Sequence, residues 1–96
     1  MAIKKEEIIA IVANKARVGR MTAEAVIDTF IGEIINSVNE GDSVNIKNFG
    51  IFESVRKAER PGRNIKAGKS VTIPAHIAPR FRPSKYFKEV VYRKVD

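Results

Sequence analysis

The chain has 96 residues, of which 30% are charged and 44% hydrophobic, with a net charge of +7 and no cysteine. The length predicts a single domain, and the lack of cysteine excludes disulfides, thiolate metal sites and a cysteine nucleophile. One histidine is too few for an all-histidine zinc site, and no apolar run approaches the roughly 20 residues that span a bilayer. We therefore expect no metal, no cofactor and no membrane partner.

The N-terminal part, about residues 1–41, is predicted to be helical. Apolar residues recur at helical spacing over residues 4–16, and again from residue 20 or 22 to residue 39, which indicates two helices. Gly41 suits the left-handed conformation that commonly ends a helix. The charged N-terminus lacks a signal-peptide core, so we expect the protein to stay in the compartment where it is made.

The apolar stripe of the second predicted helix is broader than one short neighbouring helix needs. Besides Ala23, it comprises Val26, Ile27, Phe30, Ile31, Ile34, Ile35 and Val38. We favour the interpretation that the helix buries two faces, one inward and one against a second subunit. The alternative is a wide core within one chain.

After Asp42 the period of the apolar residues changes to two, which is typical of half-buried strands. Val44 and Ile46 mark a first strand, residues 48–50 carry a turn signal, and a second strand opens at Ile51. Aromatic side chains here could stack on bases, but their apolar neighbours favour packing. The aromatic residues expected in the core are Phe30, Phe49, Phe52 and Phe81.

A basic segment punctuated by glycines follows this hairpin. The second strand runs on toward residue 60, Pro61-Gly62 and Gly68 flank a tip, and strand character returns over residues 71–81. Pro74 in the returning run indicates an edge position or a bulge. Residues 42–83 are therefore predicted to form a three-stranded antiparallel sheet that extends into a long β-ribbon arm.

The C-terminal part, about residues 84–95, is predicted to be a short helix with Ser84 as its N-cap. The fold class is therefore α+β. Positive charge is concentrated in the second half of the chain: residues 54–95 carry twelve Lys and Arg against two acids, a balance of +10. Residues 1–53 carry six against eight, a balance of −2. A field of one sign attracts polyanions, of which nucleic acid is the commonest.

The order of these elements and several short motifs resemble the bacterial HU and integration host factor family. The motifs are Gly41-Asp42-Ser43-Val44, Asn48-Phe49-Gly50-Ile51-Phe52-Glu53, Gly62-Arg63-Asn64, Ile73-Pro74-Ala75 and Phe81-Arg82-Pro83. The resemblance covers about residues 4–91. It implies an intertwined dimer, of two identical chains or of this chain and a related subunit. The two arms of this dimer reach around duplex DNA, enter its minor groove and bend it, and this family is itself a standard example of such proteins.

The predicted DNA-contacting residues lie on the arm and on the surface below it. The phosphate contacts expected along the arm are Arg56, Lys57, Arg60, Lys66 and Lys69, with Pro61 beside them, and those expected beneath the DNA are Arg80, Arg82, Lys85 and Lys88. Arg63 and Asn64 are expected to enter the minor groove, where arginine meets a strong negative potential and Asn can bind base acceptors. For each single cation the alternative is a solvated surface charge, and for Asn64 it is a left-handed turn residue.

Ile65 stands where the family normally has a proline that wedges between base pairs. Isoleucine is apolar and can serve as a wedge, although its backbone is less restricted than that of proline. We favour intercalation by Ile65. The alternatives are that the protein bends DNA less and mainly coats it, or that Ile65 packs against the turn of its own arm.

These features predict a non-enzymatic architectural protein that binds and bends duplex DNA with low sequence specificity and so compacts or shapes it. The alternative is a basic RNA-binding protein of ribosomal type, although the wide, shallow minor groove of A-form RNA suits a wedge poorly. An enzyme would need positioned acids, bases or a metal, for which this sequence offers little. We expect a cytoplasmic, nucleoid-associated protein encoded by a bacterial chromosome, a plasmid or a phage.

Overall fold

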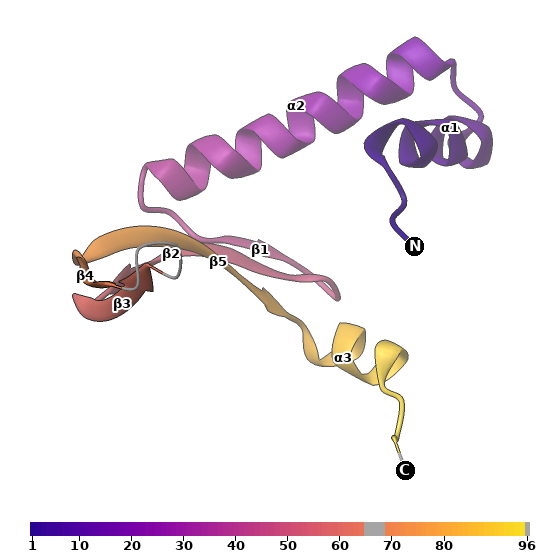
Figure 1. Ribbon diagram of the computed structural model, residues 1–96. Coiled ribbons are helices and arrows are strands. Elements are labelled where there is room, and N and C mark those ends of the chain that lie inside the picture. Colours follow the sequence, from indigo (N-terminus) through magenta and orange to yellow (C-terminus); the bar gives the residue numbers. More distant parts are fainter. Residues whose placement is uncertain (65–68, 96) are drawn as a thin grey trace. The chain divides into compact units, whose positions relative to one another are not determined.

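The computed structural model describes residues 1–64 and 69–95 (Figure 1). The described residues form three helices and five strands in the order α1, α2, β1, β2, β3, β4, β5 and α3. They fall into two compact units, Met1–Asn36 and Ser37–Asp96. The α+β class predicted from the sequence is confirmed. No helix in the described part of the chain is long and apolar enough to cross a membrane.

The first unit is built from α1 (Lys5–Ala16) and most of α2 (Arg20–Asn39). Lys4 is the N-cap of α1, and Arg17 ends the helix in the left-handed conformation with φ 58°. Ile9, Ala13 and Ala23 are buried together, with Ile27 packed against them. Both helices therefore lie where the apolar spacing predicts them.

An ion pair on the surface of this unit joins its two helices. Lys5 Nζ lies 2.5 Å from a carboxylate oxygen of Asp28. The hydrogen bond to Asp28 raises the pKa of the Lys5 ammonium above its ordinary value. Because both side chains are about half exposed, solvent screens the pair and its contribution to stability is small.

Much of the broad apolar stripe on α2 stays uncovered in the single chain. Val26, Phe30 and Ile35 are more than half exposed, at 62%, 52% and 61%, and Ile31 is 42% exposed. Ile27, Ile34 and Val38 are half-buried. A soluble chain rarely leaves so many large apolar side chains of one helix in contact with water.

The second unit is organised around an antiparallel sheet with strand order β1-β2-β5. Its strands are β1 (Val44–Ile46), β2 (Gly50–Lys57) and β5 (His76–Pro83). β2 is central, pairing Ile46 with Gly50 on one side and Phe52 with Phe81 on the other. Gly41 has φ 94°, which agrees with its predicted role in ending α2.

The turn between β1 and β2 assigns two different tasks to Asn48 and Gly50. Asn48 has φ 63°, and the Phe49 N–H donates to the Ile46 carbonyl at 3.0 Å. Gly50 already belongs to β2, where a Cβ would lie 2.5 Å from the Arg82 carbonyl oxygen and 2.6 Å from the Phe81 ring. Gly50 is therefore required by close packing beneath Phe81, and the left-handed turn residue is Asn48.

The predicted arm is a separate two-stranded ribbon made of β3 (Arg60–Asn64) and β4 (Lys69–Ile73). Its ladder runs from the pair Arg60–Ile73 to the pair Asn64–Lys69. Two residues interrupt each side where the ribbon meets the sheet, 58–59 on the way out and 74–75 on the return. The sequence pattern indicated a run over residues 71–81 with an edge position or a bulge at Pro74. In the structure the run is interrupted at residues 74–75, where proline has no N–H for the ladder.

The C-terminal helix α3 (Lys85–Val91) is shorter than predicted. The Ser84 hydroxyl accepts a hydrogen bond from the Phe87 N–H at 3.1 Å, as expected for an N-cap. The helix ends at Val91 because Tyr92 has an extended conformation, with φ −54° and ψ 130°. The Arg93 guanidinium donates to the carbonyls of residues 90, 91 and 92 and so satisfies the end of the helix.

Four phenylalanines gather where α3 meets the sheet. The ring centroids of Phe52 and Phe81 are 4.6 Å apart, and those of Phe49 and Phe87 are 5.5 Å apart in a stacked arrangement. Phe49 and Phe81 nevertheless remain 40% and 37% exposed. The aromatic cluster packs as a core but is not closed by this chain alone.

Candidate nucleic-acid interface

The predicted DNA-contacting residues that the structure describes lie on five elements of the second unit. Arg56 and Lys57 end β2, Arg60, Pro61, Arg63 and Asn64 lie on β3, Lys69 begins β4, Arg80 and Arg82 lie on β5, and Lys85 and Lys88 lie on α3. Ile65 and Lys66 lie outside the described residues. The folded chain therefore collects most of the basic half on one ribbon, the sheet that carries it and the adjoining helix.

The base of the ribbon is exposed and basic. Arg56, Lys57 and Arg60 are all exposed, and Lys57 pairs with His76 at the end of the sheet ladder. The His76 Nδ1 lies 2.9 Å from the Pro74 carbonyl oxygen. This contact fixes the imidazole at the interruption between β4 and β5, so the single histidine has a structural partner.

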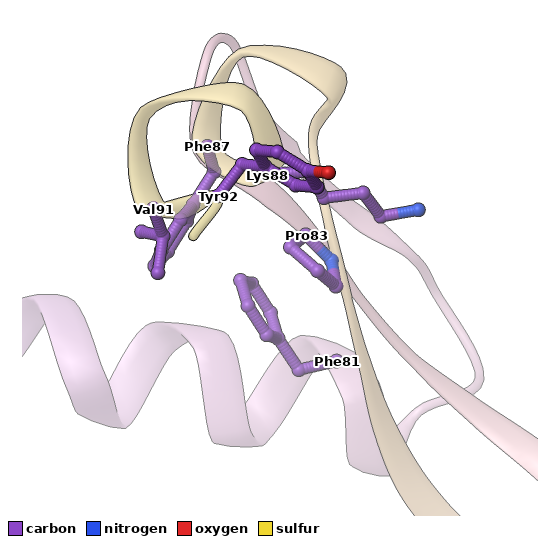
Figure 2. Close-up of a pocket in the computed structure, with 6 residues that line it drawn as sticks. All are labelled: Phe81, Pro83, Phe87, Lys88, Val91 and Tyr92. Carbon is purple, nitrogen blue, oxygen red and sulfur yellow. The ribbon is translucent and has the colours of Figure 1, made fainter. Parts of the chain in front are cut away.

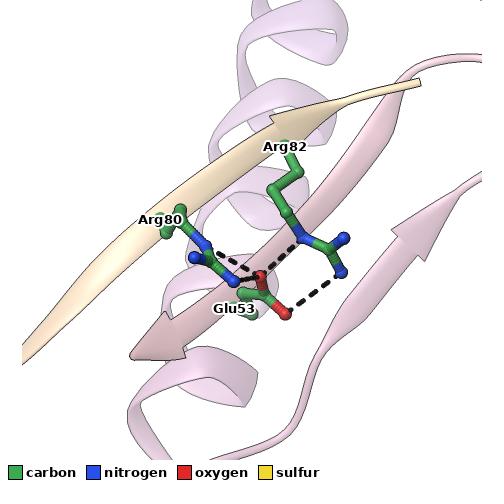
Figure 3. Close-up of polar contacts among 3 residues, drawn as sticks. All are labelled: Glu53, Arg80 and Arg82. Carbon is green, nitrogen blue, oxygen red and sulfur yellow. Dashed lines mark hydrogen bonds and ion pairs between the residues drawn. The ribbon is translucent and has the colours of Figure 1, made fainter. Parts of the chain in front are cut away.

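A carboxylate and two arginines form a compact cluster on β2 and β5 (Figure 3). Arg80 Nε and Nη2 lie 3.0 Å and 2.6 Å from Glu53 Oε2. Arg82 Nε lies 2.7 Å from the same oxygen, and its Nη2 lies 3.5 Å from Glu53 Oε1. One carboxylate thus holds two guanidinium groups from the neighbouring strand.

The strand register explains this cluster. Glu53 is directly opposite Arg80, and Arg82 is two residues further along β5. Side chains of a strand alternate between the faces of the sheet, so all three residues share one face. Phe52 and Phe81, which are also a register pair, take the opposite face and join the aromatic cluster.

Both arginines hold the Glu53 carboxylate in its charged form. The hydrogen bond from Arg80, and then that from Arg82, lowers the pKa of Glu53 below its usual 4.5. Because the pKa is lower in the folded state, the stabilisation is fully present above the unfolded value and is lost as the pH falls through the lowered one. At neutral pH the cluster carries a net charge of +1, from two cations and one anion.

Glu53 was not among the predicted site residues. Most of the acidic residues lie in the helical half, and in the sequence analysis Glu53 appears only as part of the hairpin motif. The signal that identifies it is the register: Phe52 opposite Phe81 places Glu53 opposite Arg80. That pairing depends on where the ribbon ends, which composition alone does not define.

An apolar pocket of about 310 Å³ lies between β5 and α3 (Figure 2). Its lining residues are Phe81, Pro83, Phe87, Lys88, Val91 and Tyr92. The predicted phosphate ligand Lys88 therefore stands at the rim of an apolar surface. Lys85, the other predicted ligand on α3, is 91% exposed and lies 3.9 Å from Glu89.

The described residues contain no group of three or more His, Asp or Glu side chains that could hold a metal ion. The predicted contact residues offer mainly guanidinium and ammonium groups, which are hydrogen-bond donors of positive charge. Such groups match phosphate oxygens, and arginine can bind them in bidentate fashion.

Comparison with known proteins agrees with this geometry. The family model described as bacterial DNA-binding protein matches residues 3–92. The DNA-binding protein HU of Xylella fastidiosa (strain Temecula1) is 40% identical over 93% of this chain and 95% of its own length. HU-alpha of Salmonella typhimurium is 35% identical over 93% of this chain and 99% of its own.

Solved structures show the same similarity. The cocrystal structure of Anabaena HU with DNA superposes with a TM-score of 0.85 at 38% identity, covering 93% of this chain and 98% of that one. HU from Thermotoga maritima gives a TM-score of 0.67 at 27% identity, covering 94% and 100%. These matches span nearly all of the chain, the sheet and ribbon included. The chain belongs to the HU-type family of bacterial DNA-binding proteins.

Proposed function

We propose that this protein is a non-enzymatic architectural protein that binds duplex DNA as a dimer and bends it with low sequence specificity. The observation that carries the proposal is the basic two-stranded ribbon β3–β4, which continues from β2 and β5. The similar Anabaena structure, a cocrystal of HU with DNA, supports duplex DNA as the ligand. We place the protein on the bacterial nucleoid, since its relatives are DNA-binding proteins of bacteria.

Phosphate neutralisation supplies most of the binding free energy. Each Lys or Arg that binds a phosphate releases condensed counterions, so log K falls with log salt by about 0.9 per phosphate neutralised. If one dimer engages about eight phosphates, the slope is about −7. The phosphate contacts include those of the exposed cations at the base of the ribbon, Arg56, Lys57 and Arg60.

The tip of the ribbon enters the minor groove. Arg63 and Asn64 are the last two residues of β3. Arginine is attracted to a narrow minor groove. The hydrogen-bonding pattern of the minor groove differs little between sequences, which explains a low specificity. Ile65 follows them in the sequence and takes the place of the wedge residue.

Dimerisation closes the apolar surfaces that the single chain leaves open. The exposed side chains of α2, above all Val26, Phe30 and Ile35, and the half-open aromatic cluster support this part of the proposal. Burial of apolar surface contributes about 25 cal/mol per Å², so covering several such side chains stabilises a small chain substantially. The partner is a second copy or a related subunit.

The test replaces four cations of the ribbon together, Arg60, Arg63, Lys66 and Lys69, by glutamine. Their removal lowers affinity for duplex DNA by about a hundredfold or more at 0.1 M salt and makes the salt slope less steep, because counterion release is lost. Fluorescence anisotropy over a salt series measures both quantities.

Nicked or pre-bent duplex binds the wild type more tightly than linear duplex, since part of the deformation has already been made.

A matched control removes the same charge from the helical half, with Lys4, Lys15, Arg17 and Arg20 replaced by glutamine. This variant keeps the wild-type salt slope if the ribbon carries the contact. Equal losses in both variants would contradict a ribbon interface. Stronger competition by duplex RNA than by duplex DNA at one salt concentration would instead favour an RNA-binding protein.

A further inference from the structure

The Glu53 carboxylate lies beneath the two guanidinium groups that it holds. The side chain of Glu53 is 18% exposed, whereas those of Arg80 and Arg82 are 52% and 53% exposed. Water, and any incoming anion, therefore reaches the arginines more readily than the carboxylate. Figure 3 shows Arg80 and Arg82 converging on Glu53 from β5.

The edge of each guanidinium that meets Glu53 decides what remains available. All the contacts with Glu53 use Nε and Nη2, the side edge of the group. Nη1 takes no part in them, so the end-on edge formed by Nη1 and the outer hydrogen of Nη2 is left for another acceptor. A guanidinium can bind acceptors on both edges at once, because its donors point in fixed directions.

We propose that Glu53 is a positioning residue that presents Arg80 and Arg82 together as one preformed phosphate-binding site. This inference rests on the proposed function. The phosphodiester oxygens bind the end-on edges of the two arginines, and the Glu53 contacts persist in the complex. Glu53 is not a competitor that the phosphate must displace.

The two possibilities predict opposite signs. A competing carboxylate weakens binding, so its removal tightens the complex, and the added positive charge works in the same direction. A positioning carboxylate restricts the two arginines before DNA arrives, so they lose less conformational freedom on binding. Its removal therefore weakens the complex although the net charge becomes more positive.

The experiment measures affinity for a short duplex at fixed salt with the full-length protein. Glu53→Gln is expected to weaken binding about fivefold, which is the preorganisation lost less the charge gained. Glu53→Asp keeps the charge but withdraws the carboxylate by one methylene, and it is also expected to weaken binding. Glu89→Gln is the matched control, since it removes one carboxylate from α3 and is not expected to weaken binding.

A double-mutant cycle separates positioning from a general effect on the fold. In the Arg80→Gln, Arg82→Gln background, Glu53→Gln should cause no further loss, because the side chains that it positions are absent. A persisting loss in that background would show that Glu53 acts through the stability of the sheet. Circular dichroism melts of each variant confirm that folded proteins are being compared.

The outcomes also separate this inference from the proposed function. If the ribbon variants lose affinity while Glu53→Gln binds as tightly as the wild type, or more tightly, the positioning role is wrong and the DNA-binding function stands. If the wild type does not bind duplex DNA above the level of the ribbon variants, the proposed function itself is wrong.

Discussion

Because Gly50 has no side chain, the Phe81 ring of the aromatic cluster can pack directly against strand β2. The position lies under the Phe81 ring and next to the Arg82 carbonyl, at distances that a Cβ does not tolerate. Phe81 in turn contacts Phe49, Phe52 and Phe87 within 6.3 Å between ring centroids. The same strand pairing sets Arg80 and Arg82 on the outer face, so packing on one face positions the cations of the other.

At this scale we predict that Gly50→Ala lowers the free energy of unfolding by about 1–3 kcal/mol, because the added methyl forces the Phe81 ring and strand β5 apart. Urea denaturation measures the change. Gly32→Ala is the matched control, since nothing lies within 4 Å of a Cβ built there. Inside helix α2 this control should stabilise the protein by about 0.5–1 kcal/mol. A Gly50→Ala protein as stable as the wild type would contradict the packing role.

At the scale of elements, the sequence predicts those with a strong period. Residues 5–16 and 20–39 form the expected helices, and the change of period after Asp42 locates β1 and β2. One feature, the end of α3, escapes the pattern. Helix α3 stops at Val91, where Arg93 turns back onto its carbonyls, although apolar and basic residues continue beyond it.

The candidate site was predictable to a similar extent. Charge segregation and the glycine-flanked segment identify the ribbon and its cations, since both are local properties of the sequence. The role of Glu53 was not, because it arises from the pairing of residues 27 and 29 positions apart in the chain. Cross-strand partners of this kind follow from the register, which a single sequence defines only weakly.

A further prediction concerns Ile65, which follows the last residue of β3 in the sequence. Ile65→Ala should reduce both the DNA bend angle and the affinity, because alanine is too small to hold two base pairs apart. Energy transfer between dyes at the ends of a short duplex measures the bend. Ile65→Pro, which restores the residue usual in the family, should bend DNA at least as much as the wild type. An unchanged bend angle and affinity in Ile65→Ala would remove the wedge from the mechanism.

The whole molecule divides its tasks between two oppositely charged halves. The helical half carries a slight negative balance and a large exposed apolar surface, whereas the second half carries the cations. DNA is attracted by the cationic half, whereas a slightly negative half offers it no such attraction. The apolar surface of α2 remains available for the partner subunit.

For the whole molecule we predict that Ile35→Asp weakens the dimer, because it places a charge in an apolar interface. Ile35 is 61% exposed in the single chain. Sedimentation velocity should show a shift toward monomer, and DNA affinity should fall because one chain supplies only one arm. Thr29→Asp adds the same charge to the same helix at another exposed position and should leave the dimer intact. A dimeric Ile35→Asp protein would exclude this face as the interface.

The interruptions at residues 58–59 and 74–75 form a hinge between the ribbon β3–β4 and the three-stranded sheet. Cross-strand pairing stops at Lys57 and His76 and resumes at Arg60 and Ile73, so flexing at that level breaks no rung of either ladder. The ribbon β3–β4 can therefore change its angle to the sheet without loss of strand pairing in either. We expect such a hinge to let the ribbon adapt to duplexes of different curvature while the three-stranded sheet keeps its pairing.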